Sequence, residues 1–273
     1  VGSEMCIRDS FNIFGGLALA GITGIVVIGG LKRIAEVATF LVPLMGSIYF
    51  GAMIVALILN LNLVLPAFKL ILVDAFNGTA IAGGTFFGVL IYGVRRGAFS
   101  NEAGMGTESL VHGVAKVSNP VKQGLVAMTG PIFDTLIICT ATALMILVSG
   151  VWETSSSQGV TLTAEAFSIL LGSFGGLILF VCVICFGLST IFTYSYYGAS
   201  CSRFLFGKFG MKFYIYLYIL SIFIYSIVPI DIAINIADGA FAMMAIPTLI
   251  SALWLAPKVM QASKNYFKLI DNN

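Results

Sequence analysis

Long runs without a charged residue constrain this chain more than any other feature. Residues 37–68 and 166–202 contain no Asp, Glu, Lys or Arg. Charged residues make up only 10% of the whole chain, against about 25% in a soluble domain, and the mean hydropathy is +1.04. Because the hydrocarbon core of a bilayer offers no partners to backbone polar groups, apolar runs of this length are stable there as helices. The sequence predicts an all-α polytopic membrane protein.

The gaps between charges predict about seven transmembrane segments, since about 20 residues cross a bilayer. These are residues 10–31, 39–61, 83–116 (a broken segment), 122–150, 175–200, 213–228 and 232–257. Residues 62–82 contain Pro66, Lys69, Asp74 and an Asn-Gly turn pair, and are expected to form an outer connection. A polar outer loop is expected at residues 152–165.

Positive residues gather at alternate loops and predict the orientation. Loops that carry them are expected on the cytoplasmic side, which places the C-terminus and a tail at residues 268–273 in the cytoplasm. Lys69 is the one exception. The positive group is Lys32, Arg33, Lys116, Lys122, Arg203, Lys208, Lys212, Lys258, Lys264 and Lys268, and the intervening loops carry Glu153, Glu165 and Asp231.

Residues 1–10, VGSEMCIRDS, differ in composition from everything that follows. They are polar and charged, and they lack the basic region and small-residue cleavage site of a signal peptide. We expect them to be a non-native polar leader. The natural chain would then begin upstream of Phe11, and residues 11–273 would be a C-terminal fragment.

The run GVRRGAFSNEAGMGTESLVHGVAK, residues 93–116, combines ionisable side chains with glycines inside an apolar chain. Charges at membrane depth are costly unless they pair or line a cavity, and glycines weaken a helix. The pattern predicts a break between a half-helix ending near Arg96 and another starting near Glu102, with Ser100 or Asn101 as its cap. The N–H groups of the second half-helix would face an anion such as a substrate carboxylate. We interpret the break as a substrate or ion site.

Soluble-type catalysis has little support in the sequence. It contains no GxSxG, HExxH or P-loop motif, and only one histidine. Cys182 and Cys185 form an isolated CxxC that is expected to be buried hydrophobic side chains and not a metal site. We expect no enzyme and no cofactor. An intramembrane enzyme built from Glu102, His112 and Asp134 stays a remote alternative. The net charge of +2 gives no indication of nucleic acid.

The stretch GAFSNEAGMGTESLVHGVAK, followed by NPVKQGLVAMTGPIFDTLIICTATALMIL, resembles the signature region of the alanine or glycine:sodium symporter family. Similar matches are VIGGLKRIAEVATFLVPLM, LSTIFTYSYYGASCSRFLFG and NIADGAFAMMAIP. The resemblance covers residues 11–267. It implies a leucine-transporter-like fold of five-plus-five inverted repeats, in which sodium drives uptake of alanine or glycine across the plasma membrane of a prokaryote. Other cation-coupled amino-acid transporters and channels stay open as alternatives.

The resemblance also implies how the chain divides. Residues 11–61 correspond to the end of the first repeat and residues 83–267 to the second repeat. The first three core helices have no counterpart, so this chain is expected to be an incomplete and inactive transporter. Thr107, Glu108 and Ser109 stand where the family usually has small residues, and Glu108 has no assigned role.

Site residues carried over from the family fall on two helices. Phe99, Ser100, Asn101 and Gly104 match the substrate-facing break, where Phe99 would wall a small side chain and Asn101 would bind the ammonium group. Sodium would be held by the Phe186 carbonyl and the hydroxyls of Ser189 and Thr190. Their i, i+3, i+4 spacing places three oxygens on one helix face, and oxygen ligands suit a hard cation.

The remaining charges near the break are expected to have structural or gating roles. They are Arg95, Arg96, Glu102 and Asp134. We expect the two arginines to neutralise Glu102 or Asp134 and so hold the break together. His112 is expected to be an interfacial imidazole.

Overall fold

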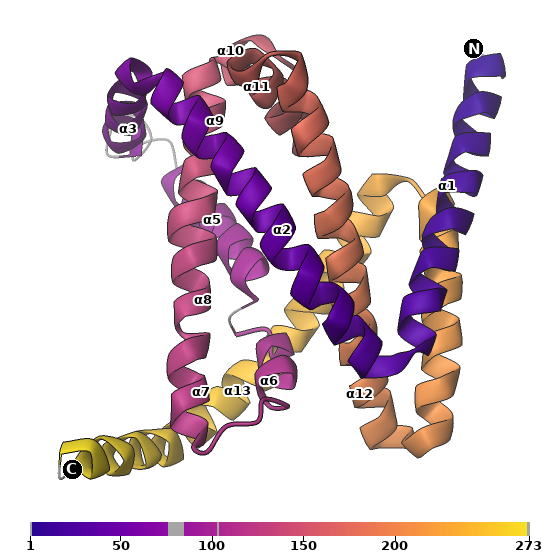
Figure 1. Ribbon diagram of the computed structural model, residues 1–273, viewed down its shortest axis with the longest axis vertical. Helices are drawn as coiled ribbons and strands as arrows, with labels where there is room; N and C mark the ends of the chain where they lie inside the picture. Colours follow the sequence, from indigo (N-terminus) through magenta and orange to yellow (C-terminus); the bar gives the residue numbers. More distant parts are fainter. Residues whose placement is uncertain (1, 76–84, 103, 272–273) are drawn as a thin grey trace.

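The computed structural model describes residues 2–75, 85–102 and 104–271, and these are helical or in short connections, without a strand (Figure 1). The fold is therefore all-α, as predicted. The helices are α1 (Gly2–Ile28), α2 (Gly30–Leu59), α3 (Leu61–Ala75), α5 (Thr85–Asn101), α6 (Thr107–His112), α7 (Pro120–Ala127), α8 (Thr129–Pro131), the π-helix η1 (Ile132–Cys139), α9 (Thr140–Ser149), α10 (Val151–Thr154), α11 (Val160–Leu171), α12 (Ser173–Ile227) and α13 (Ile230–Asp271).

Four helical stretches within the described residues are long and apolar enough to cross a membrane. They are Lys32–Leu59 in α2, Pro120–Ser149 through α7, α8, η1 and α9, Ser173–Ile227 in α12, and Ile232–Ile270 in α13. The apolar part of α1 is shorter, at Ile13–Ile28. Large side chains stand exposed on these helices, including Phe14, Phe204 and Trp254. Such surfaces are covered by lipid in a membrane protein.

Helix α12 consists of two antiparallel arms. The backbone turns at Gly207, whose φ of 69° lies in the left-handed region that glycine adopts without strain. The second arm returns beside α1 (Figure 1), where Gly16 meets Ser226 and Gly24 meets Ile219. The two separate segments expected at residues 175–200 and 213–228 are therefore present, one on each arm.

Tyr49 on α2 joins four elements in the core. Its ring stacks on Phe167 of α11 at 5.5 Å between centroids and meets Phe186 of α12 edge-on at 5.8 Å. Its hydroxyl lies 2.8 Å from the Thr142 hydroxyl of α9, which itself donates to the Ile138 carbonyl at 2.9 Å. A buried hydroxyl needs such a partner, and so this contact fixes how α2 and α9 approach each other.

The connections differ in part from the sequence expectation. Helix α3 occupies most of the expected outer connection, whose remaining residues 76–82 lie outside the described residues. Helix α11 begins at Val160, inside the expected polar loop. Ser157 donates to Glu165 on this helix at 2.6 Å. Hydrogen bonds from Ser155 and Ser157 hold the pKa of the Glu165 carboxyl below its usual range. Helix α1 runs through position 10 without interruption.

The close approach of the α12 arms generates a stability prediction. A Cβ at Gly198 would overlap the phenol ring of Tyr214 on the other arm. We expect Gly198→Val to destabilise the purified protein by about 1–3 kcal/mol through overpacking. Gly51→Ala on α2 is the matched control, because no atom lies within 4 Å of its added Cβ. Thermal unfolding in detergent measures both, and equal melting temperatures for the two variants would contradict this packing.

Candidate functional site

The chain breaks between α5 and α6, as predicted, but later than predicted. Helix α5 continues to Asn101, and α6 begins only at Thr107. Glu102, Gly104 and Gly106 have φ values of 55°, 82° and 86°, a conformation that glycine adopts readily. The expected end near Arg96 was wrong, because side-chain hydrogen bonds hold Ser100 and Asn101 in the last turn of α5.

Neither Ser100 nor Asn101 caps the second half-helix. Gly106 is the N-cap residue of α6, and it makes no side-chain cap bond. With six residues, α6 makes fewer than two turns, so its dipole supports carboxylate binding only weakly. The polar chemistry of the break lies on the α5 side.

Three neighbouring helices hold the break in place. From η1, Asp134 accepts a hydrogen bond from the Ser100 hydroxyl at 2.5 Å. From α12, the Tyr197 hydroxyl donates to the Glu102 carboxylate at 3.4 Å. From α13, the Thr248 hydroxyl reaches the Gly104 carbonyl at 2.6 Å, and the same hydroxyl lies within 3.0 Å of two carbonyls of its own helix. Only the Thr248 contact reaches a freed backbone carbonyl, and such a group needs a partner in hydrocarbon.

The pairing with η1 uses two adjacent residues from each helix. The Asn101 amide donates to the Thr135 hydroxyl at 3.1 Å, and that hydroxyl lies 3.5 Å from the same Asp134 oxygen that Ser100 binds. Neighbours on an α-helix diverge by about 100°, whereas the wider π-helix reduces that angle. The π-helical segment therefore presents Asp134 and Thr135 to one partner together.

Two cavities meet at the contact between Ser100 and Asp134. One, of about 350 Å³, is the α6-side cavity, lined by Ser100, Asn101, Glu102, Glu108, Val111, His112, Gly130, Asp134, Thr193 and Tyr197. The other, of about 600 Å³, is the α11-side cavity, lined by Tyr49, Ser100, Asp134, Ile138, Cys139, Val160, Thr163, Leu179, Val183, Phe186, Gly187, Thr190 and Ile191. The first is rich in polar side chains and the second is mainly apolar.

The charges near the break are arranged differently from the expectation. Arg96 donates to the Tyr92 hydroxyl at 3.1 and 3.3 Å and lies over that ring. No ion pair joins Arg96 to Glu102 or Asp134 among the residues that the structure describes. Arg96 follows Tyr92 by four residues, or one helical turn, so its guanidinium group reaches the Tyr92 hydroxyl on its own helix and not a carboxylate on another element. The side chains of Arg95 and Phe99 lie outside the described residues.

His112 belongs to a small polar cluster on α6. Its Nδ1 atom lies 2.7 Å from the Gln123 amide nitrogen, which must donate, and its Nε2 atom lies 3.9 Å from Glu108. Glu102, His112 and Asp134 all line the α6-side cavity. In the described part of the chain, no hydrogen bond or ion pair joins any two of them.

The three residues predicted to bind sodium lie together on α12, with different orientations. The Ser189 hydroxyl is buried and donates to the Phe186 carbonyl at 2.9 Å. Thr190 is exposed and lines the α11-side cavity together with Phe186. The spacing therefore brings two of the oxygens into contact and turns the third toward the cavity.

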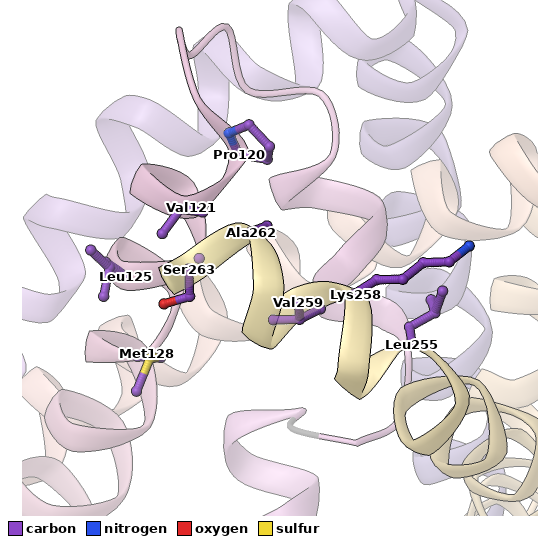
Figure 2. Close-up of a pocket in the computed structure, with 10 residues that line it drawn as sticks. Pro120, Val121, Leu125, Met128, Leu255, Lys258, Val259, Ala262 and Ser263 are labelled. Carbon is purple, nitrogen blue, oxygen red and sulfur yellow. The ribbon is translucent and has the colours of Figure 1, made fainter. Parts of the chain in front are cut away.

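An apolar pocket of about 580 Å³ between α7 and α13 is unsuited to an amino acid. Its walls are mostly aliphatic, and among the described residues that line it Lys258 alone is charged. Figure 2 shows the Lys258 ammonium group extending away from Leu125 and Met128. A zwitterion needs polar groups that converge on it, and this pocket lacks them among its lining residues.

Sequence reasoning missed three residues that hold the break. Tyr197 was not predicted as a site residue, and its hydroxyl binds Glu102. Thr135 and Thr248 were not singled out. Each has a weak local signal: Thr135 directly follows Asp134 in an apolar stretch, and Thr248 follows Pro247 within the charge-free residues 239–257.

Comparisons with known proteins agree with this architecture. A sequence model described as the sodium:alanine symporter family matches residues 4–273. The transporter YflA of Bacillus subtilis is 37% identical over 94% of this chain and 56% of its own length. A transporter of Haemophilus influenzae is 34% identical over 98% of this chain and 60% of its own length. The sodium/alanine symporter AgcS of Methanococcus maripaludis is 35% identical over 94% of this chain and 57% of its own length. The chain thus spans little more than half the length of these relatives.

The contact between α13 and the break yields a second prediction. Thr248→Val removes the hydroxyl that reaches the Gly104 carbonyl while keeping the side-chain volume. A hydrogen bond between membrane helices contributes about 0.6 kcal/mol, so we expect amide hydrogen exchange at residues 104–107 to become about threefold faster. Mass spectrometry measures the exchange. Thr248→Ser is the matched control and should exchange like the parent; unchanged exchange in Thr248→Val would show that α13 does not brace the break.

Proposed function

The chain belongs to the sodium:alanine symporter family, and from this premise we propose that it takes part in sodium-coupled symport of alanine or glycine by alternating access. The observation that carries the proposal is the polar break between α5 and α6, which adjoins two cavities inside an apolar helical protein. The relatives are bacterial and archaeal, which supports a prokaryotic plasma membrane. The distribution of Lys and Arg supports a cytoplasmic C-terminus.

The C-terminal end of α5 is suited to the ammonium group of an amino acid. The last carbonyls of a helix lack intrahelical partners and carry partial negative charge. We propose that Ser100, Asn101 and the backbone near Gly104 bind the amino acid there, with Phe99 as the wall beside its small side chain. The adjoining α6-side cavity, at about 350 Å³, lies at the small end of the range for ligand pockets. This favours a small substrate.

Sodium is proposed to bind beside α12 at the Phe186 carbonyl and the Ser189 and Thr190 hydroxyls. Neutral oxygen ligands attract a hard cation without the net charge that would hold it too tightly for release. Phe186 and Thr190 line the cavity that also contains Ser100, so cation and amino acid would occupy adjacent positions. Three oxygens alone leave the shell incomplete, and transport is therefore best tested on the product of the whole reading frame that encodes this sequence.

The proposal is tested by uptake into liposomes that contain that protein. Labelled alanine or glycine should accumulate when sodium is higher outside, and potassium in place of sodium should abolish accumulation, because only a bound sodium ion couples its gradient to the substrate. Equal uptake in potassium would refute sodium coupling. Uptake that does not saturate with alanine, together with conduction far above transporter rates, would instead indicate a channel.

The sodium ligands give a sharper prediction. Ser189→Ala combined with Thr190→Ala should raise the sodium concentration for half-maximal uptake by about tenfold, corresponding to about 1.4 kcal/mol of binding energy. Ser221→Ala combined with Thr39→Ala is the matched control, since these hydroxyls donate to carbonyls of their own helices and lie outside both cavities. An equal sodium dependence in the two double variants would remove Ser189 and Thr190 from the sodium site.

A further inference from the structure

The two cavities at the break lie in series along α12. Residues 179–191 of its first arm contribute to the α11-side cavity, and Thr193 and Tyr197 contribute to the α6-side cavity. At 1.5 Å per residue, the centres of these two stretches are about 15 Å apart along the helix axis. Because this arm belongs to an apolar stretch long enough to cross a membrane, the two cavities lie at different levels along it, and we expect them to be reached from opposite sides.

Ser100 and Asp134 are the two residues that line both cavities. The hydrogen bond between them, at 2.5 Å, therefore lies where one cavity ends and the other begins. Asn101 and Thr135 extend the same contact on the α6 side. The Thr135 hydroxyl in turn points to Asp134, so the four side chains form one connected network across the α5–η1 contact.

On this basis we propose that Ser100, Asn101, Asp134 and Thr135 form a clamp that keeps the two cavities separate, as alternating access requires, and that loss of its hydrogen bonds connects them. The inference rests on the proposed transport function and assigns Asp134 and Thr135 as positioning residues within it. An isolated carboxylate at membrane depth is costly, so Asp134 favours the closed contact. The contact contains no Lys or Arg among the described residues that make it, and it can therefore open without separating an ion pair.

Cysteine accessibility tests the clamp without depending on transport. In a background with every cysteine of the whole protein replaced by Ser, including Cys139, Cys182, Cys185 and Cys201, single reporters are Thr163→Cys in the α11-side cavity and Val111→Cys in the α6-side cavity. A membrane-impermeant thiol reagent is added to one side of sealed, oriented liposomes that contain the whole protein. With the clamp intact, each reporter should react from its own side only.

Removing the clamp should connect the cavities. In Asp134→Ala combined with Thr135→Val, each reporter should react from the far side about tenfold faster or more, because loss of these bonds shifts the equilibrium toward the open state. Ser100→Ala is the milder variant and should act in the same direction. Unchanged far-side reaction in both variants would overturn the proposal.

Matched variants separate the clamp from loss of charge or of structure. Glu108→Gln removes a carboxylate that lines the α6-side cavity alone and should leave far-side reaction unchanged. Asp134→Asn keeps an oxygen that accepts from Ser100 and should stay closed; if it opens, or if Glu108→Gln opens equally, the clamp is refuted. Cys182, only 1% exposed, reports general loosening when retained as the single cysteine. If the clamp variants raise the rate of thiol reaction at Cys182 as much as at Thr163→Cys and Val111→Cys, the clamp is also refuted.

The outcome of this test is distinct from that of the uptake test. If far-side reaction rises in the clamp variants but the parent protein shows no sodium-dependent uptake, the clamp is supported and the proposed function is refuted. Uptake by a protein whose cavities stay separate after Asp134 and Thr135 are replaced would refute the clamp alone.

Discussion

Hydrocarbon supplies no hydrogen-bond partners, and the structure depends on how this chain meets that constraint at one place. Between Asn101 and Thr107 the backbone leaves the helix, so its polar groups must find partners within the protein. Thr248 of α13 supplies one through its contact with the Gly104 carbonyl. Asp134 of η1 and Tyr197 of α12 instead bind the side chains of Ser100 and Glu102 beside the break. These contacts place η1, α12 and α13 around the break, and residues of η1 and α12 line the cavities beside it.

The partners at the break are hydroxyls, an amide and carboxylates, joined by hydrogen bonds. Such contacts would suit the conformational change that the proposed transport requires. Ser100 and Asn101 bind a carboxylate and a hydroxyl through hydrogen bonds, and such bonds between membrane helices are individually modest. An arginine–carboxylate pair in the same place would be harder to separate at low dielectric. Arg96 instead contacts Tyr92 on its own helix. The core around Tyr49 provides the rigid counterpart, since it joins α2, α9, α11 and α12 through packing and one hydroxyl contact.

The sequence and the structure agree best where composition decides the outcome. The charge-free residues 166–202 predicted membrane helix, and α12 covers most of that run. The glycines at residues 93–116 predicted a broken helix, and the break is present. Its position was wrong by several residues, because the end of α5 is set by bonds from Ser100 and Asn101 to a helix 34 residues away in sequence. Local propensity contains no information about such partners.

By itself, the sequence determined the all-α membrane class, the approximate spans, the presence of a broken helix and the resemblance to sodium-coupled amino-acid symporters. Those properties follow from hydropathy, glycine content and local motifs, each of which depends on residues close together in sequence. Only the tertiary structure decided where the break lies, that a π-helix pairs Asp134 and Thr135 with Ser100 and Asn101, and that two cavities meet at this contact. These depend on distances between residues far apart in sequence, and such distances are fixed only when the helices pack.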